Sequence, residues 1–192
     1  MNQYSLRTMS DQPEGNIKMR LRRTFTLLAG LTPAVTMLGV APPAHAAPSV
    51  VRSSAALSDL SPVADATDGA YARLYAVAPG DGNAYVYFVL TGLSTASVGT
   101  TYGAHVHVGP CLAGSGAAAL GHYNSGAGGA PSRLNEVWLD FAVRPGGVAV
   151  ASTVVPFVIA PGAARSVVVH ANPTQPGTGL AGGRIACLPV QF

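Results

Sequence analysis

The stretch YARLYAVAPGDGNAYVYFVL, residues 71–90, carries the pattern that decides the fold. Its first part alternates large and small side chains, so that Tyr71 and Tyr75 lie on one face of an extended chain and alanine or leucine on the other. Pro-Gly-Asp-Gly-Asn at 79–83 is a strong turn signal, and 85–90 is a second run of β-branched and aromatic residues. This stretch therefore predicts an antiparallel β-hairpin.

Strand-like runs continue along the rest of the chain, at residues 103–108, 136–143, 148–155, 165–170 and 183–190. No window carries the stripe of an amphipathic helix, and the short spacing of the runs indicates an all-β antiparallel sandwich or barrel. Two long glycine-rich stretches, 112–134 and 172–182, do not fit the strand pattern. Long loops of this kind in a compact β domain are where functional sites tend to lie.

Residues 1–46 are expected to be a leader that is removed from the working protein. A basic segment at 19–23, an apolar run at 24–40 and Ala-His-Ala at 44–46 together are typical of a secretory signal peptide. The run is short for a bilayer and contains glycine and proline, so no stable membrane insertion is expected after cleavage. The arginine pair at 22–23 resembles a twin-arginine signal. The protein is thus expected to be secreted or held in the cell envelope.

The remaining sequence is predicted to be a loose N-terminal arm at 47–66, rich in Ala, Ser and Pro, followed by one β domain at 67–192. Residues 47–192 contain six arginines, no lysine and six acidic side chains, so their formal net charge is zero. The basic excess of the full chain therefore belongs to the leader. This balance gives no indication of a nucleic-acid partner or of an acidic membrane surface.

The two cysteines, Cys111 and Cys187, occur in a chain expected to enter an oxidising compartment. A disulfide is the default interpretation there, and two free buried cysteines are the alternative. Closing a loop of this length would raise the free energy of the unfolded chain by roughly 4–5 kcal/mol, because it removes conformational entropy from that chain.

Four histidines remain after the leader. His105 and His107 are two residues apart on a predicted strand, so they project from the same face and can converge on one metal ion, although a pair of surface histidines would look the same. His122 lies in the first long loop, and His170 ends a strand at the mouth of the second. Four nitrogen ligands without a thiolate favour copper, with zinc as the rival ion.

Four stretches occur in the order found in the copper–zinc superoxide dismutase family: GAHVHVGPC at 103–111, GHYN at 121–124, SVVVHANPT at 166–174 and GGRIACLPV at 182–190. The chain resembles this family over essentially all of residues 47–192. The resemblance implies a Greek-key antiparallel β-sandwich or barrel, immunoglobulin-like and of the superoxide dismutase type, with two long active-site loops.

The resemblance also implies roles for individual residues. His105, His107 and His170 match the ligands that bind copper alone, and His122 matches the histidine that bridges copper and zinc. Arg184 matches the arginine that attracts the anionic substrate, superoxide. The pairing of Cys111 with Cys187 matches the disulfide that ties the active-site loop to the last strand.

The zinc half of the family's site is missing from the sequence. No histidine occurs between His122 and Arg144, and Thr174 stands where the family places the aspartate that links the two metal sites. Zinc is therefore not expected, and the pattern resembles the copper-only branch of the family. Some other group must then orient His122. Glu136 is the first candidate and Asp140 the next, although a glutamate exposed on a strand is a common alternative.

These observations predict a secreted, copper-dependent superoxide dismutase that converts superoxide to dioxygen and hydrogen peroxide. A copper-binding or copper-buffering protein without enzymatic activity is the alternative on the same fold. A β-sandwich interaction module with a vestigial site is a weaker third interpretation. The sequence identifies neither a dimer face nor the source of the copper.

Overall fold

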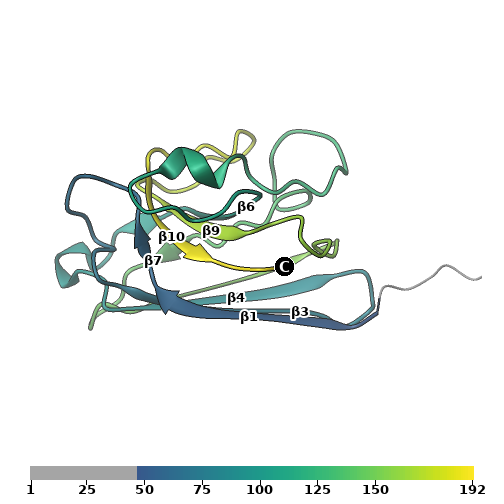
Figure 1. Cartoon of the computed structure of the whole chain (residues 1–192), viewed down its shortest axis with the longest axis horizontal. Coiled ribbons are helices and arrows are strands. Elements are labelled where there is room, and N and C mark those ends of the chain that lie inside the picture. Colours follow the sequence, from purple (N-terminus) through teal and green to yellow (C-terminus); the bar gives the residue numbers. More distant parts are fainter. Residues whose placement is uncertain (1–46) are drawn as a thin grey trace, which may run out of the picture. The chain divides into compact units, whose positions relative to one another are not determined.

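The computed structural model describes residues 47–192 of the chain, so the signal peptide predicted within residues 1–46 lies outside the described residues. In the described part, antiparallel sheets dominate and helix is limited to two short 3-10 turns, η1 (Thr95–Ser97) and η2 (Gly116–Ala119). No helix in this part is long and apolar enough to span a bilayer. The predicted all-β antiparallel class is confirmed (Figure 1).

The first sheet contains the hairpin that the opening stretch predicts. Its strand order is β1-β3-β4-β8, with bounds Ser49–Ala56, Tyr71–Ala78, Ala84–Thr91 and Ala149–Val155. In the hairpin, Tyr75 lies opposite Tyr87. The alternation sends Leu74 and Phe88 into the core and the tyrosines outward, as the period of two requires.

The second sheet carries the metal-ligand candidates. Its strand order is β2-β10-β9-β6, with bounds Ser58–Asp59, Arg184–Pro189, Ser166–His170 and Ala104–His107. A small third sheet pairs β5 (Thr101–Tyr102) with β7 (Phe141–Ala142). The inner faces of the two large sheets share one apolar core, in which residues such as Phe88, Val106 and Leu188 are fully buried.

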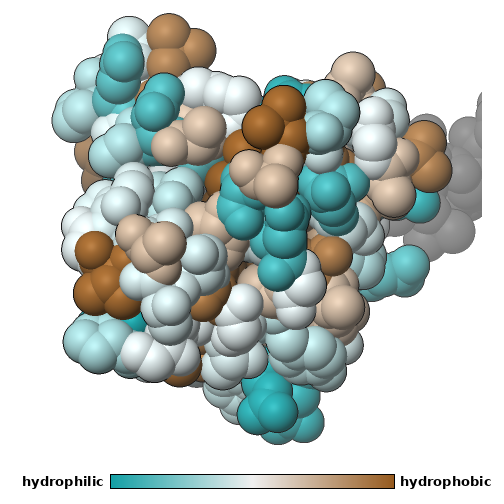
Figure 2. All heavy atoms as spheres, turned by 90° about the vertical axis from the view of Figure 1, so that its left-hand side faces the viewer, coloured by the Kyte–Doolittle hydropathy of each residue, from teal (hydrophilic) through white to brown (hydrophobic). Residues whose placement is uncertain are grey.

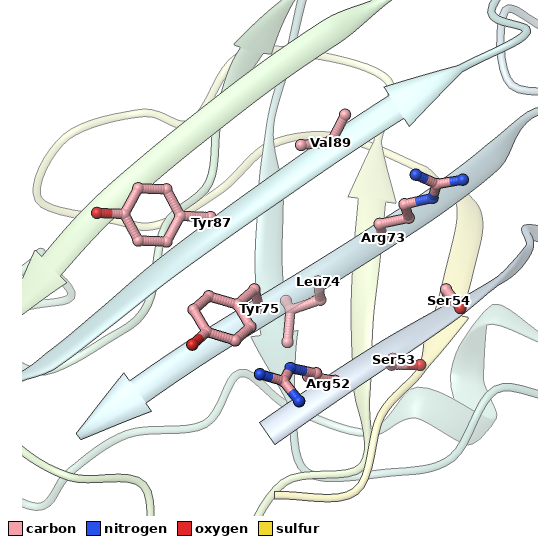
Figure 3. Close-up of a pocket in the computed structure, with 8 residues that line it drawn as sticks. All are labelled: Arg52, Ser53, Ser54, Arg73, Leu74, Tyr75, Tyr87 and Val89. Carbon is pink, nitrogen blue, oxygen red and sulfur yellow. The ribbon is translucent and has the colours of Figure 1, made fainter. Parts of the chain in front are cut away.

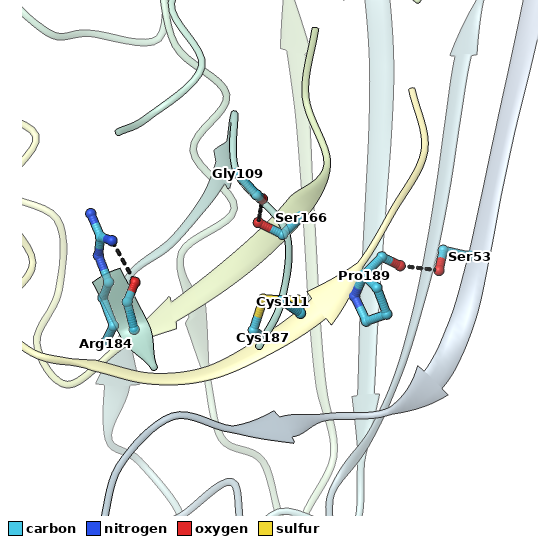
Figure 4. The surroundings of a disulfide bond; sticks show 8 residues. Ser53, Gly109, Cys111, Ser166, Arg184, Cys187 and Pro189 are labelled. Carbon is cyan, nitrogen blue, oxygen red and sulfur yellow. Dashed lines mark hydrogen bonds between the residues drawn. A yellow bond between two sulfur atoms is a disulfide. The ribbon is translucent and has the colours of Figure 1, made fainter. Parts of the chain in front are cut away.

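The prediction that residues 47–66 form a loose arm is wrong. All eight residues of β1 pair with β3, and β2 pairs with β10. The Ala, Ser and Pro content hid a period-two pattern, and pairing with the open edge of β3 supplies hydrogen bonds that an isolated segment lacks. The Ser53 hydroxyl also donates to the Pro189 carbonyl oxygen at 2.6 Å, which ties β1 to β10 across the sandwich (Figure 4).

The strand predicted at 136–143 is shorter than expected, because only Phe141–Ala142 forms a regular strand, β7. Upstream of it, single bridges join Trp138 to His105 and Glu136 to Asn124. The segment therefore runs along the ligand-bearing strand β6 and holds its polar side chains beside the histidines.

One end of the domain, on the left of Figure 1, shows only small, separated hydrophobic patches (Figure 2).

Candidate metal centre

Four histidines from three parts of the fold converge on one place. His105 and His107 project from the same face of β6, while Val106 between them points into the core. His170 ends the neighbouring strand β9, and His122 forms a β-bridge with His107 from the loop that follows η2. One ligand nitrogen of each lies within 4.8 Å of the others. This is close to the roughly 4 Å that separates two nitrogens on opposite sides of one metal ion.

Backbone carbonyls fix two of the four rings. His107 Nδ1 lies 3.1 Å from the Leu120 carbonyl oxygen, and His170 Nδ1 lies 3.2 Å from that of Gly182. A carbonyl oxygen only accepts, so each Nδ1 carries the hydrogen of a neutral ring and each Nε2 holds a lone pair. These two Nε2 atoms face each other at 3.3 Å, an arrangement that a cation between them would stabilise.

A relay of three side chains fixes His105. Its Nε2 lies 2.6 Å from Thr174 Oγ1, and the same hydroxyl lies 2.6 Å from Asp140 Oδ1. The carboxylate can only accept, so the hydroxyl donates to Asp140 and accepts from His105 Nε2–H. The Thr174 backbone N–H also donates to Asp140 at 2.9 Å, which holds the relay in place.

Glu136 fixes the fourth ring. His122 Nδ1 donates to Glu136 Oε2 at 2.9 Å, and the Trp138 indole N–H donates to the same oxygen at 2.8 Å. Glu136 is only 5% exposed. The alternative interpretation from the sequence, an exposed glutamate in contact with solvent, is therefore wrong. His122 therefore has Nε2 free, and its other nitrogen is bound to a carboxylate.

The residues present fit a metal ion. His105 Nδ1 is buried and has no hydrogen-bond partner among the described residues, which is costly for a polar atom unless something binds it. With the other nitrogens engaged as above, the free donors are Nδ1 of His105 and Nε2 of His107, His122 and His170. Four neutral imidazole donors without sulfur suit copper or zinc.

Burial keeps three of the rings in the neutral form that binds metal. Desolvation, followed by the charge of His122, lowers the pKa of His105 to about 2 and that of His107 to about 3. Desolvation also lowers the pKa of His170 to about 4, although its hydrogen bond to Gly182 opposes the shift. Protons therefore compete poorly with a metal at these nitrogens.

Acid is expected to destabilise the metal-free protein. In the unfolded chain the pKa of each of these three histidines is near 6.5. Below that pH the unfolded state therefore binds protons at these rings, whereas the folded state does not. Above pH 6.5 the three histidines cost the folded state nothing. Below pH 6.5 each of them lowers the free energy of unfolding by about 1.4 kcal/mol per pH unit, until the pH reaches its pKa in the folded state. Between pH 7.5 and pH 5, urea unfolding should show a loss on the order of 5 kcal/mol. An unchanged midpoint would contradict this.

Arg184 lies at the mouth of the centre. It begins β10 opposite His170, and its guanidinium donates to the carbonyl oxygens of Gly116 and Leu120. Arg184, His170 and His122 are among the residues that line an open pocket of about 430 Å³. A fixed positive charge therefore faces an opening that leads to two of the four rings.

Leu120 organises two parts of the centre through one carbonyl, which accepts from both His107 and Arg184. Its φ of 57° and ψ of −148° lie in a region that is nearly restricted to glycine, so the backbone is strained there. The disulfide Cys111–Cys187 joins the same loop to β10 (Figure 4).

The structure brings together the four histidines, Arg184 and Glu136. Asp140 is also close, but its predicted contact with His122 is wrong, since the intervening Thr174 directs it to His105. Sequence reasoning missed the roles of Thr174, Trp138 and Leu120. Only Thr174 had a signal, because it replaces an acid that the resembled family carries at that position.

The fold and the site define a β-sandwich with a buried four-histidine cluster. No protein-family model matches the sequence, and no curated protein matches it either. Among solved structures, the chain is similar to the crystal structure of the clock protein EA4, with a TM-score of 0.54 and 17% identity over 77% of this chain and 96% of that one. At this identity the likeness shows the fold alone.

Replacement of Thr174 by valine is expected to weaken metal binding by about 10–100-fold, the usual cost of losing the partner that orients a ligand. Valine keeps the shape of threonine but leaves His105 Nε2–H without its acceptor. Competition with a chelator measures the affinity. The matched control is Thr174→Ser, which keeps the hydroxyl and should bind the metal as the parent does. Equal affinities for the valine and serine variants would show that the relay does not orient His105.

Proposed function

We propose that this protein is a copper-dependent superoxide dismutase that works without a structural zinc ion. The observation that supports this best is the convergence of four imidazole nitrogens beside a pocket that contains Arg184. The reaction consumes two superoxide ions and two protons and yields dioxygen and hydrogen peroxide. The bound copper would supply the redox chemistry by alternating between Cu(II) and Cu(I).

The chain's own groups supply binding, orientation and protons. Arg184 carries a positive charge at the pocket and would hold a small anion there, as fixed charges do where negative charge must be stabilised. His122 is the most exposed of the four rings, with 20% of its side chain accessible, so its Nε2 could exchange a proton with water whenever it does not hold the metal ion. Imidazole suits proton transfer near neutral pH. His122 would thus deliver a proton as peroxide forms.

Glu136 would take over the orienting role that zinc has in the two-metal sites of the resembled family. Its Oε2 accepts from both His122 and Trp138, so the carboxylate is itself held in place. His122 Nδ1, the nitrogen that would face a zinc ion, is occupied by this bond. The disulfide fits an oxidising compartment, and we also propose that the protein is exported.

The proposed function is tested on the full chain loaded with copper in the absence of zinc. The expected result is about one copper per chain, catalytic removal of superoxide, and no gain on adding zinc. Arg184→Ala should lower turnover while copper stays bound, and Arg144→Ala, which removes an exposed arginine elsewhere, should not. Tight copper without turnover would favour copper buffering. A failure to bind copper would leave only an interaction module.

Glu136→Gln is expected to lower turnover by about 10–100-fold, because a neutral amide oxygen accepts more weakly than the carboxylate from His122 Nδ1–H and the Trp138 indole N–H. Copper should still bind through four nitrogens, so metal content is measured beside turnover and the copper EPR spectrum. Asp81→Asn, on the exposed hairpin, is the control. Unchanged turnover and spectrum in Glu136→Gln would remove Glu136 from the proposal.

A further inference from the structure

The first sheet presents its largest side chains to solvent. Along β3 and β4 the inward positions are mostly alanine, valine or leucine, whereas Tyr71, Tyr75 and Tyr87 point outward with 39, 38 and 47% of their surface exposed. Large aromatic side chains that gather on one solvent-facing side of a sheet form an apolar patch, and such a patch indicates a binding surface. This face lies on the sheet β1-β3-β4-β8, whereas His105, His107 and His170 lie on the second sheet, β2-β10-β9-β6.

A groove of about 330 Å³ opens on this face (Figure 3). Strand pairing places Arg52, Tyr75 and Tyr87 side by side in one row across three strands. The next row contains Ser54, Arg73 and Val89. Tyrosine rings therefore form one wall of the groove, and a guanidinium lies at each of two diagonal positions.

Both guanidiniums lie near aromatic rings. Arg52 lies 5.1 Å from the centre of the Tyr75 ring, and Arg73 lies 5.8 Å from that of Tyr71. Within residues 47–192, no carboxylate forms a salt bridge with either arginine. Asp81, at the hairpin between β3 and β4, instead binds the Asn83 backbone N–H and the Tyr85 hydroxyl. The groove therefore combines flat apolar rings with two positive charges that have no acidic partner in this part of the chain.

We propose that this groove binds an acidic polysaccharide whose sugar rings carry carboxylates. The C–H faces of pyranose rings would stack on Tyr75 and Tyr87, and the carboxylates would pair with Arg52 and Arg73, since the guanidinium fork matches that group. Diagonal positions on neighbouring strands are about 7–8 Å apart, so two carboxylates spaced along a glycan chain can reach both arginines.

The balance of charge favours this partner over a nucleic acid. Nucleic-acid binding depends on many cations that release counterions from the phosphates. Residues 47–192 have no net charge, and the groove offers two arginines. A second copy of the same face is also disfavoured, because the groove has no acidic side chain that could pair with the arginines of the other copy. Sparse charge on a stacking surface fits a glycan with intermittent carboxylates.

Affinity electrophoresis of the full chain in gels that contain alginate tests this inference. The parent should be retarded, and the double variants Tyr75→Ala/Tyr87→Ala and Arg52→Gln/Arg73→Gln should each bind at least ten-fold more weakly. Arg144→Gln, which removes an exposed arginine outside the groove, should bind as the parent does. Copper content and circular dichroism show that each variant is folded.

Four outcomes would overturn the inference: no retardation in alginate, equal retardation in neutral dextran, an equal loss in Arg144→Gln, or tighter binding to single-stranded DNA than to alginate. Concentration-dependent dimerisation that the tyrosine variants abolish, without glycan binding, would assign the face to a second copy instead. None of these results depends on superoxide turnover, so the inference stands or falls separately from the proposed enzymatic function.

Discussion

Replacement of His170 by glutamine is expected to reduce copper affinity by more than a hundred-fold and to bring superoxide turnover to background. The ring ends β9, is 4% exposed, and directs Nε2 to a point 3.3 Å from His107 Nε2. Glutamine reaches about as far as histidine, but its amide nitrogen only donates and has no imidazole lone pair, so one of four nitrogen donors is lost. Since losing a partner of a ligand already costs about 10–100-fold, losing the ligand itself should cost more.

A change inside the same pocket but outside the donor set controls for indirect effects. Gln175 lines the pocket, and the hydrogen bonds described for it involve only its backbone, so Gln175→Ala should keep copper and turnover. Chelator competition gives the affinity, and circular dichroism with a thiol assay shows whether the fold and the disulfide persist. A folded His170→Gln variant that binds copper as tightly as the parent would exclude the four-nitrogen centre.

Local patterns were sufficient to predict the hairpin β3–β4. The alternation from Tyr71 onward and the turn at 79–83 act within one stretch of chain, and the observed register follows them. Strand β1 was missed for the opposite reason. Apart from Val50 and Val51, its side chains are polar or small and carry little β-propensity, and it becomes a strand because β3 offers an open edge, which is a tertiary effect.

The site divides in the same way. The four short sequence motifs that contain the histidines and Arg184 were sufficient to name these residues as candidates for the site, because each motif is chemically distinctive. The supporting groups depend on which segments meet in space: Asp140 and Thr174 are 34 residues apart, and His105 and Thr174 are 69 apart. The sequence offered Glu136 as a candidate partner of His122 beside the interpretation of a solvated glutamate; the observed contact and burial follow from packing that the sequence does not reveal.

Removal of the disulfide, as Cys111→Ala/Cys187→Ala, is expected to lower the free energy of unfolding by roughly 4–5 kcal/mol. The two cysteines are 76 residues apart, and opening a loop of that size returns this much conformational freedom to the unfolded chain. Urea unfolding of the copper-free protein measures the change. The reduced parent should match the double variant, and reductant should leave the variant unaffected; a parent that is equally stable oxidised and reduced would contradict the prediction.

The same change should weaken the metal centre in the folded state. Cys111 anchors the loop that carries the Leu120 carbonyl, which accepts from His107 and Arg184, and also carries His122. Leu120 holds a backbone conformation that few residues other than glycine adopt, so the loop needs external support to keep it. Without the disulfide, the strain can relax and the carbonyl can turn away. Copper affinity should then fall even at urea concentrations well below the unfolding transition, whereas loss of copper only on global unfolding would show that the loop holds its shape unaided.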